Sequence, residues 1–204
     1  MTLIKEKTLL YGASGHAKVI CSIFESMNIE VESIIDDNKD VYLKNHNVIY
    51  NYDNNYKPEL PILISIGDNL TRKKISEMIT RVFSTAVHSS AILDDFSKIG
   101  AGTSVFHGSI VQRDAFIGNH CIINTNSSID HECIIEDFVH IAPSATLCGN
   151  VKIGEGTLIG SNATVLPNIK IGKWCIIGAG AVVNKNIPDF SMVTGVPGKI
   201  LKML

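Results

Sequence analysis

The chain has 204 residues, of which 45% are hydrophobic and 19% are charged, with a net charge of −2. That charge, without a basic stretch, argues against nucleic acid or an anionic membrane as a partner. No apolar run approaches the roughly 20 residues that span a bilayer, and the N-terminal segment lacks the apolar core of a signal peptide. We therefore expect a cytoplasmic protein of one or two domains, without membrane insertion.

The cysteines predict neither a disulfide framework nor a zinc site. There are five of them, an odd number, and no C-x-x-C pair occurs. We expect them to be small apolar side chains in a reducing cytosol, and we expect no metal. They are Cys21, Cys121, Cys133, Cys148 and Cys175.

The first 85 residues alternate between predicted strands and helices. Apolar runs that end in glycine or acid predict strands, and apolar residues at helical spacing predict helices. The strands are expected at 7–12, 31–37 and 61–69, the helices at 15–27 and 70–81, and a polar loop at 51–60. This alternation predicts an α/β domain over residues 1–85 with a small parallel, Rossmann-like sheet.

From residue 87 the period changes to six. Every sixth residue from Val87 to Val183 is Ile, Leu or Val, which makes 17 in succession. The residues four places after these aliphatics, from Thr103 to Ile187, are small or β-branched throughout. A hexapeptide period indicates a parallel β-helix, with both sets facing inward. The tail at 187–204 is expected to close it.

Glycine often follows the aliphatic residue of the repeat. We expect these glycines to occupy turns whose backbone angles are unusual. They are Gly100, Gly118, Gly154, Gly160, Gly172 and Gly178.

The pattern [LIV]-G-x-x-[STAV]-x resembles that of the hexapeptide-repeat acyltransferases. This resemblance implies a left-handed β-helix of triangular cross-section over residues 86–204, with 18 residues per coil. It also implies acetyl-CoA as co-substrate and a homotrimer. Some β-helices are purely structural or bind a ligand without turnover, so the fold alone leaves the function open.

His131 and Glu132 occupy the third and fourth positions of their hexapeptide, where the repeat imposes no core constraint. We therefore expect the His131 ring to be exposed. Histidine can accept a proton near neutral pH, and a neighbouring carboxylate can hold the ring and raise its basicity. The pair suits acetyl transfer, in which an amine or hydroxyl must lose a proton.

The segment 124–156, "NTNSSIDHECIIEDFVHIAPSATLCGNVKIGEG", is similar to the central segment of bacterial nucleotide-sugar N-acetyltransferases. It most resembles the UDP-4-amino-sugar acetyltransferases of the bacillosamine pathway. By that resemblance His131 is the general base, Glu132 increases its basicity, and His140 lies beside the acetyl-CoA thioester. The family's coenzyme contacts fall on Ser161 and Ala179, one coil apart. Sialic-acid O-acetyltransferases and GDP-perosamine N-acetyltransferases are relatives.

Three other histidines rank below His131, and only one of them is a candidate site residue. His107 shares the third position with His131 and is the competing candidate. His88 is expected to be structural at the junction of the two halves, and His120 is expected on the surface.

The stretch "YGASGHAKVI" at 11–20 indicates a phosphate-binding turn before a helix N-terminus. It lacks the G-x-G-x-x-G fingerprint, which disfavours an NAD enzyme. It resembles the G-A-S-G-H motif of the amino-sugar acetyltransferases, which implies that Ser14, Gly15 and His16 contact the nucleotide-sugar. Three further residues end predicted parallel strands, where ligands bind: Asp36, Asp37 and Gly67. Asp36 and Asp37 could equally begin a turn.

We predict an acetyl-CoA-dependent sugar N-acetyltransferase acting on the 4-amino group of a nucleotide-linked, UDP-type amino-deoxysugar, in bacterial surface-glycan or glycoprotein synthesis. Transfer would be direct, within a ternary complex in a cleft between subunits. Two alternatives remain open for the acceptor: a sialic-acid hydroxyl and GDP-perosamine. A binding protein without turnover is the alternative of another class.

Overall fold

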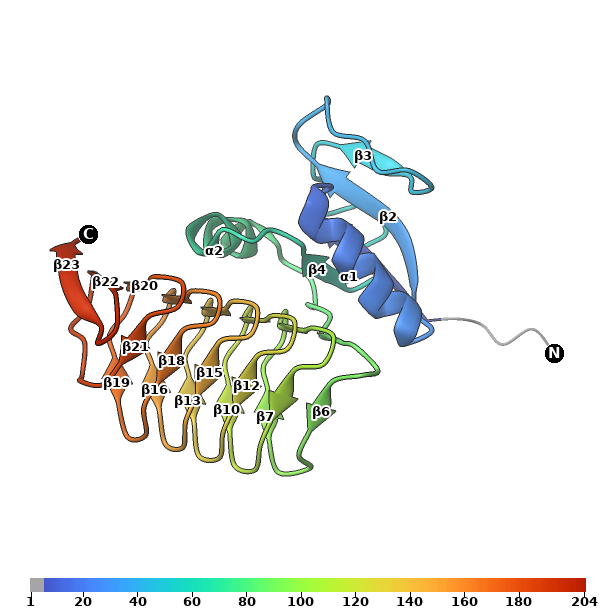
Figure 1. The fold of residues 1–204 in the computed structure, drawn as a ribbon. Helices are drawn as coiled ribbons and strands as arrows, with labels where there is room; N and C mark the ends of the chain where they lie inside the picture. Colours follow the sequence, from blue (N-terminus) through green and yellow to red (C-terminus); the bar gives the residue numbers. More distant parts are fainter. Residues whose placement is uncertain (1–5) are drawn as a thin grey trace.

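The computed structural model describes residues 6–204, and it has an α/β region beside a long solenoid (Figure 1). Residues 1–5, which begin the N-terminal segment on which the signal-peptide expectation rests, lie outside the described residues.

The α/β region is a four-stranded parallel sheet with two helices. The strand order is β3-β2-β1-β4. Its elements are β1 (Lys7–Tyr11), α1 (Gly15–Ser26), β2 (Glu30–Asp36), β3 (Val48–Tyr50), β4 (Ile62–Ile64) and α2 (Asn69–Met78). The predicted Rossmann-like sheet is confirmed, and residues 51–60 form a loop as predicted. The short strand β3 was not predicted, because its three half-exposed or exposed residues carry no buried apolar run.

The solenoid has three parallel sheets, and the strands along each are 18 residues apart. We number these faces in chain order. The first face contains β5 (Ala86–Val87), β8 (Ser104–Val105), β11 (Ile122–Ile123), β14 (His140–Ile141), β17 (Leu158–Ile159), β20 (Ile176–Ile177), β22 (Ser191–Thr194) and the antiparallel β23 (Lys199–Met203). The second contains β6 (Ile92–Leu93), β9 (Ile110–Val111), β12 (Ser128–Ile129), β15 (Thr146–Leu147), β18 (Thr164–Val165) and β21 (Val182–Val183). The third contains β7 (Lys98–Ile99), β10 (Phe116–Ile117), β13 (Ile134–Ile135), β16 (Lys152–Ile153) and β19 (Lys170–Ile171).

The interior of the prism is formed by the two sets of residues that the period predicts. The aliphatics of the ladder and the small residues four places later form one continuous buried cluster, which includes Ile129, Cys133 and Ile135. This confirms the predicted left-handed β-helix of 18-residue coils. The tail closes the solenoid through β22 and β23, as predicted.

The glycines that follow the ladder aliphatics were expected to occupy turns with unusual backbone angles, and this prediction is wrong. Positive φ occurs two residues later, for example at Gly102 (φ 72°) and Gly156 (φ 69°), and not at Gly100 or Gly160. These glycines are needed because the coils approach closely. A Cβ on Gly100 would lie 2.5 Å from the Gly118 carbonyl carbon, and one on Gly160 would lie 2.6 Å from the Ala179 nitrogen.

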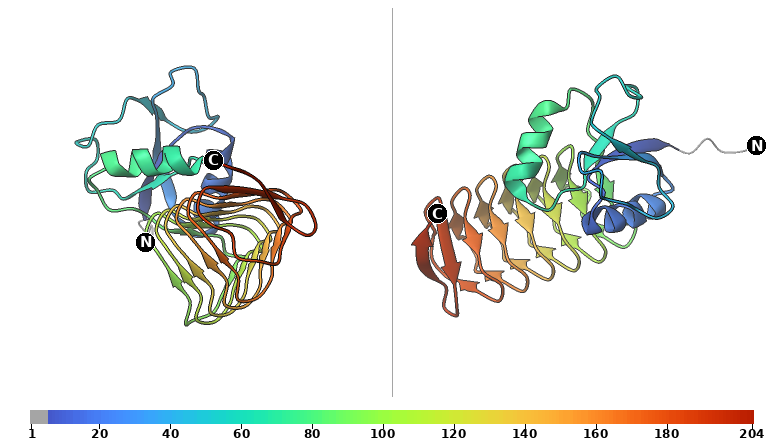
Figure 2. Two further views of the ribbon diagram at one scale, coloured as in Figure 1. Left: turned by 90° about the vertical axis from the view of Figure 1, so that its left-hand side faces the viewer. Right: turned by 90° about the horizontal axis from the view of Figure 1, so that it is seen from above.

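The α/β region lies against the first face of the solenoid, and Figure 2 shows this from two further sides. Phe24 of α1 belongs to the same buried apolar cluster as Phe106 and Ile122 of the solenoid. Asp68 is the N-cap of helix α2, and its side chain accepts a hydrogen bond from the Thr71 N–H at 2.8 Å. The helix is joined to the solenoid by an ion pair between Lys73 and Glu155.

Candidate functional site

The carboxyl edge of the parallel sheet gathers the predicted nucleotide residues. The Ala13 N–H, in the glycine turn, donates to Asp36 Oδ2 at 2.7 Å, and the Asn38 N–H donates to Asp36 Oδ1 at 2.9 Å. Asp36 therefore shapes both turns, which favours the turn interpretation for this residue. Asp37 is exposed and accepts a hydrogen bond from the Tyr11 hydroxyl, and burial and Asp37 together raise the pKa of Tyr11.

The start of α1 faces the same edge. Ser14 and Gly15 are exposed, and a helix N-terminus has N–H groups free to bind an anion. His16 points toward the solenoid instead, where its ring stacks on Phe106 with the centroids 5.3 Å apart. Its Nε2 is buried without a hydrogen-bond partner, and burial lowers the pKa of His16 to about 4. His16 is therefore neutral at physiological pH.

His140 projects outward from β14 on the first face, beneath the end of β4. Its Nε2 is 3.0 Å from Asn124 Nδ2. Asn124 Oδ1 accepts the Thr125 N–H at 2.8 Å, which orients the amide so that Nδ2 donates to the ring. Burial, with a smaller contribution from the charge of Arg72, lowers the pKa of His140 to about 3. His140 is thus a neutral ring whose Nε2 is an acceptor.

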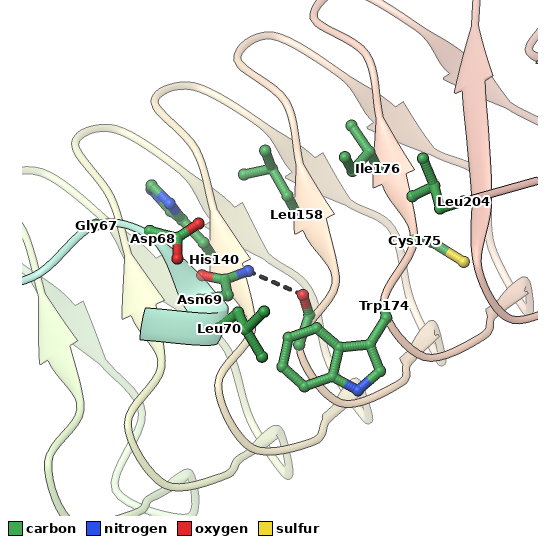
Figure 3. Close-up of a pocket in the computed structure, with 11 residues that line it drawn as sticks. Gly67, Asp68, Asn69, Leu70, His140, Leu158, Trp174, Cys175, Ile176 and Leu204 are labelled. Carbon is green, nitrogen blue, oxygen red and sulfur yellow. Dashed lines mark hydrogen bonds between the residues drawn. The ribbon is translucent and has the colours of Figure 1, made fainter. Parts of the chain in front are cut away.

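A pocket of about 300 Å³ extends from His140 along the first face (Figure 3). Leu158 and Ile176 follow His140 on the adjacent paired strands, so their side chains continue outward in one row. Trp174, Leu204 and the first turn of α2 complete the wall. Most of this wall is apolar, with polar groups gathered at the His140 end.

The predicted catalytic pair lies on the corner between β12 and β13, joining the second and third faces. Their side chains are 56% and 64% exposed, as predicted, and His131 Nδ1 is 3.1 Å from Glu132 Oε2. Glu132 has a φ of 59°, a left-handed conformation that is uncommon for glutamate. The backbone is thus strained where the side chain meets His131.

One chain does not bring His131 to the other site residues. His140, Gly67 and His16 gather at the first face, whereas the His131 corner joins the other two faces. In a triangular prism that corner is opposite the first face. Ser161 and Ala179 lie on another edge, where strands of the first face turn toward the second. The Ser161 carbonyl there accepts the Gly180 N–H at 2.8 Å, and Ala179 is exposed.

The remaining histidines have structural surroundings. His120 is only 7% exposed, so its expected place on the surface is wrong. Its ring lies between Phe83 and Phe138, because the packed α/β region covers that edge of the solenoid. His88 stacks on His107 with the centroids 3.6 Å apart, away from His131.

Three residues of this region were not predicted from the sequence: Arg72, Asn69 and Trp174. Arg72 is 1% exposed, and Asn69 donates to the Gly156 carbonyl at 2.9 Å. Lys73 of α2 lies over the Trp174 ring, 5.5 Å from its centroid. The only signal for α2 was its helical pattern, which does not say what the helix packs against.

Residues 6–204 contain neither a helix suited to span a membrane nor a cluster suited to bind a metal. No helix there is both long and apolar enough to cross a bilayer. No cluster of three or more histidine, cysteine, aspartate or glutamate side chains is placed to hold a metal ion.

The chain is similar to known proteins over almost its whole length. Two family profiles match it: "PglD N-terminal domain" over residues 7–79 and "Bacterial transferase hexapeptide (six repeats)" over residues 150–185. A histidine-to-asparagine mutant of perosamine N-acetyltransferase from Caulobacter crescentus, solved with CoA and GDP-perosamine, is 30% identical with a TM-score of 0.92. The match covers 98% of each chain.

Two further relatives are also acetyltransferases. The acetyltransferase domain of PglB from Neisseria gonorrhoeae, solved with acetyl coenzyme A, is 30% identical with a TM-score of 0.90, over 97% of this chain and 100% of that one. GDP-perosamine N-acetyltransferase from Escherichia coli is 32% identical over 48% of this chain and 46% of its own length. This chain spans about half the length of the curated relatives that it matches.

Proposed function

Because the chain belongs to the hexapeptide-repeat sugar N-acetyltransferases that carry a PglD-type N-terminal domain, we propose that it transfers acetyl from acetyl-CoA to the 4-amino group of a nucleotide-linked amino-deoxysugar. The observation that carries this proposal is the exposed pair of His131 Nδ1 and Glu132 Oε2, 3.1 Å apart. A sugar linked to UDP is our first candidate. A GDP-linked sugar is the second, favoured by the complex of the Caulobacter crescentus enzyme with GDP-perosamine.

His131 is proposed as the general base. An ionised Glu132 can only accept a hydrogen bond, so His131 Nδ1 carries the proton and the Nε2 lone pair is free. Nε2 takes a proton from the sugar amine while the amine nitrogen forms its bond to the acetyl carbon. The carbon–sulfur bond then breaks, and the departing thiolate takes that proton from the imidazolium. No covalent acetyl-enzyme is required.

The nucleotide is proposed to bind at the carboxyl edge of the sheet. Ser14 and Gly15 offer the start of α1 to the phosphates, and Asp37 and Gly67 follow strands β2 and β4, which end at the same edge of the sheet. His16 is retained as a proposed contact from the side of the solenoid, where its ring packs on Phe106. Asp36 acts there by holding the Ala13 N–H and thus the glycine turn.

The pocket beyond His140 suits the pantetheine arm of acetyl-CoA. Leu158 and Ile176 form an apolar row parallel to the solenoid axis, and a long, thin molecule can follow it. His140 at the head of this row would lie beside the thioester. Ser161 and Ala179 are retained as proposed contacts for the rest of the coenzyme.

We propose a homotrimer in which His131 of one copy faces the nucleotide site of its neighbour. The support is the geometry of the prism, which separates His131 from His140 within one chain. The outward residues of the second face are uncharged and mostly small, which suits a surface covered by another copy. They are Ile92, Ile110, Ser128, Thr146, Thr164 and Val182. We also retain the division into domains at residues 1–85 and 86–204, and a reducing cytoplasmic location, which the five free cysteines suit.

A thiol-release assay tests the function. Acetyl-CoA is offered with UDP-4-amino-sugars, GDP-perosamine or sialic acids. His131→Ala is expected to lower the rate roughly 10²- to 10⁴-fold, the usual contribution of a general base. His107→Ala is the matched control, because His107 shares the hexapeptide position but stacks on His88. Wild-type rates in His131→Ala would refute the mechanism, and turnover with sialic acid alone would refute the acceptor.

A further inference from the structure

Asp37 carries the available carboxylate at the carboxyl edge of the α/β sheet. Both oxygens of its neighbour Asp36 are already used by backbone N–H groups. Asp37 is exposed, and its Oδ2 accepts a hydrogen bond from the Tyr11 hydroxyl at 2.5 Å. Among residues 6–204, no hydrogen bond or ion pair uses its Oδ1. Of the two acids at this edge, Asp37 is therefore the one that can accept a hydrogen bond from a ligand.

The Tyr11 ring is fixed by its packing. It is 4% exposed and belongs to a buried apolar cluster that includes Ile35 and Ile64 of the two adjacent strands. Its centroid lies 5.7 Å from that of Tyr52. Burial, followed by the Asp37 carboxylate, raises the pKa of Tyr11 above its usual range. The hydroxyl therefore stays protonated at physiological pH and donates to the carboxylate from a rigid base.

The place of Asp37 beside the glycine turn indicates what it would bind. Strands β1 and β2 are adjacent, with Tyr11 opposite Ile35. Asp37 thus follows the strand next to the one that leads to Ser14 and Gly15, the proposed phosphate contacts. A carboxylate repels phosphate and needs a hydrogen-bond donor instead. The hydroxyls of the ribose next to the phosphates are such donors, and acids at the ends of parallel strands can accept from them.

We propose that Tyr11 is a positioning residue, which holds the Asp37 carboxylate so that it accepts hydrogen bonds from the ribose hydroxyls of the nucleotide-sugar. The ribose is common to UDP and GDP, so this contact selects a ribonucleotide without selecting the base. The presence of a nucleotide rests on the proposed function, whereas the test of the contact does not require acetyl transfer.

The test is calorimetric titration with UDP, GDP and their 2′,3′-dideoxy counterparts. The unaltered protein is expected to bind the ribonucleotide at least about tenfold more tightly than the dideoxy form, because the latter loses hydrogen bonds to a charged group. Tyr11→Phe keeps the ring and removes only the hydroxyl, so this preference is expected to fall roughly threefold or more. Asp37→Ala should abolish the preference.

Tyr56→Phe is the matched control. The Tyr56 hydroxyl also bonds to a side chain of β2, Ser33 Oγ at 3.0 Å, but before the strand reaches the carboxyl edge. This variant should leave the preference for ribose unchanged. A general loss of packing in Tyr11→Phe would weaken both forms of the nucleotide equally, so only a change in their ratio supports positioning.

Three outcomes would overturn the proposal. The first is equal affinity of the unaltered protein for the ribonucleotide and its dideoxy form, which decides the question even if no variant folds. The second is an unchanged ratio in folded Tyr11→Phe. The third is a preference for GDP over UDP that Asp37→Ala removes, because the carboxylate would then bind guanine.

Kinetics separate this inference from the proposed function. In Tyr11→Phe the KM for the nucleotide-sugar is expected to rise about fivefold with kcat unchanged, because the ribose contact is equally strong before and during transfer. An unaltered protein that prefers the ribonucleotide but transfers no acetyl would refute the proposed function and support the role of Tyr11. Acetyl transfer without any preference for ribose would do the reverse.

Discussion

The imidazole of His131 lies directly against Gly149 of the next coil. A Cβ on Gly149 would be 2.7 Å from both Cε1 and Nε2 of the ring. Such a contact is too short, so this glycine leaves the space in which the proposed base sits.

Gly149→Ala is therefore expected to displace the His131 ring while leaving the solenoid intact, since the ring is exposed and can move. Because a misplacement of about 1 Å can cost up to 10²-fold in rate, we expect acetyl transfer to fall roughly 10- to 100-fold. The rate assay is paired with a thermal melt. In the background of His131→Ala, the second substitution should have no further effect on rate, and an additive loss would contradict this relationship.

The backbone conformation of Glu132 is expected to lower stability, while its carboxylate is expected to support activity. Glu132→Gly should relieve the φ of 59°, raising the free energy of unfolding by up to about 1 kcal/mol, because left-handed angles cost most residues about that much. The same variant should lose activity, since nothing then holds His131 Nδ1. Urea unfolding and the thiol assay measure the two effects.

Asp114→Gly is the matched control for Glu132. Asp114 has a φ of 60° at the same position of its hexapeptide. Aspartate tolerates this conformation better, so a smaller gain in stability and an unchanged rate are expected. Equal rates in Glu132→Gly and the unaltered protein would contradict the role of the carboxylate.

Mixed trimers test whether the site is shared between copies. His131→Ala chains are inactive at the base, and Gly15→Glu chains carry a negative charge where phosphate is proposed to bind. A Cβ at Gly15 meets nothing within 4 Å, so the second variant should fold. Co-refolding of the two should restore part of the activity, because some sites combine an intact base with an intact nucleotide pocket.

The control mixture combines His131→Ala with Glu132→Gln chains, whose defects lie on the same corner. That mixture should restore far less activity than the mixture with Gly15→Glu. Failure of both mixtures, with trimers present by sedimentation, would place the whole site within one chain.

The stability of helix α2 depends on its N-cap residue, Asp68. Asp68→Ala removes the hydrogen bond to the Thr71 N–H and is expected to lower the free energy of unfolding by about 1 kcal/mol at pH 7. The bonds from Thr71 lower the pKa of Asp68, so this contribution is present above the unfolded pKa of about 4 and is lost as pH falls through the folded pKa. Denaturant titrations measure the free energy of unfolding of the unaltered protein and of Asp68→Ala. The difference between these two free energies should be smaller at pH 3 than at pH 7.

His16 should make the protein less stable in mild acid. Its folded pKa of about 4 is below the unfolded value of roughly 6.5, so the unfolded chain takes up a proton first as pH falls. Stability is then full above pH 6.5 and declines toward pH 4. His16→Phe can keep the stacking on Phe106, and between pH 7 and pH 5 its free energy of unfolding should fall by about 2 kcal/mol less than that of the unaltered protein. Parallel pH curves for the two proteins would contradict this.

The sequence predicted the solenoid well because each inward position must repeat a fixed volume at every sixth residue. It also placed Gly12 and Gly67 at strand ends, since apolar runs that end in glycine are a local signal. The comparisons confirm the family that the segment 124–156 resembles. The strand β3 gave no such signal, because its residues are only partly buried.

The features that follow from the amino-acid sequence alone are those that repeat or are local: the period, the inward residues, and the exposure of His131 and Glu132. The contacts between residues far apart in the chain depend on tertiary packing. The burial of His120 and the hydrogen bonds of Arg72 depend on how a helix packs on a distant coil, and no spacing encodes that contact. The separation of His131 from His140 likewise follows from the corner and the face on which each residue falls once the chain is wound into a prism.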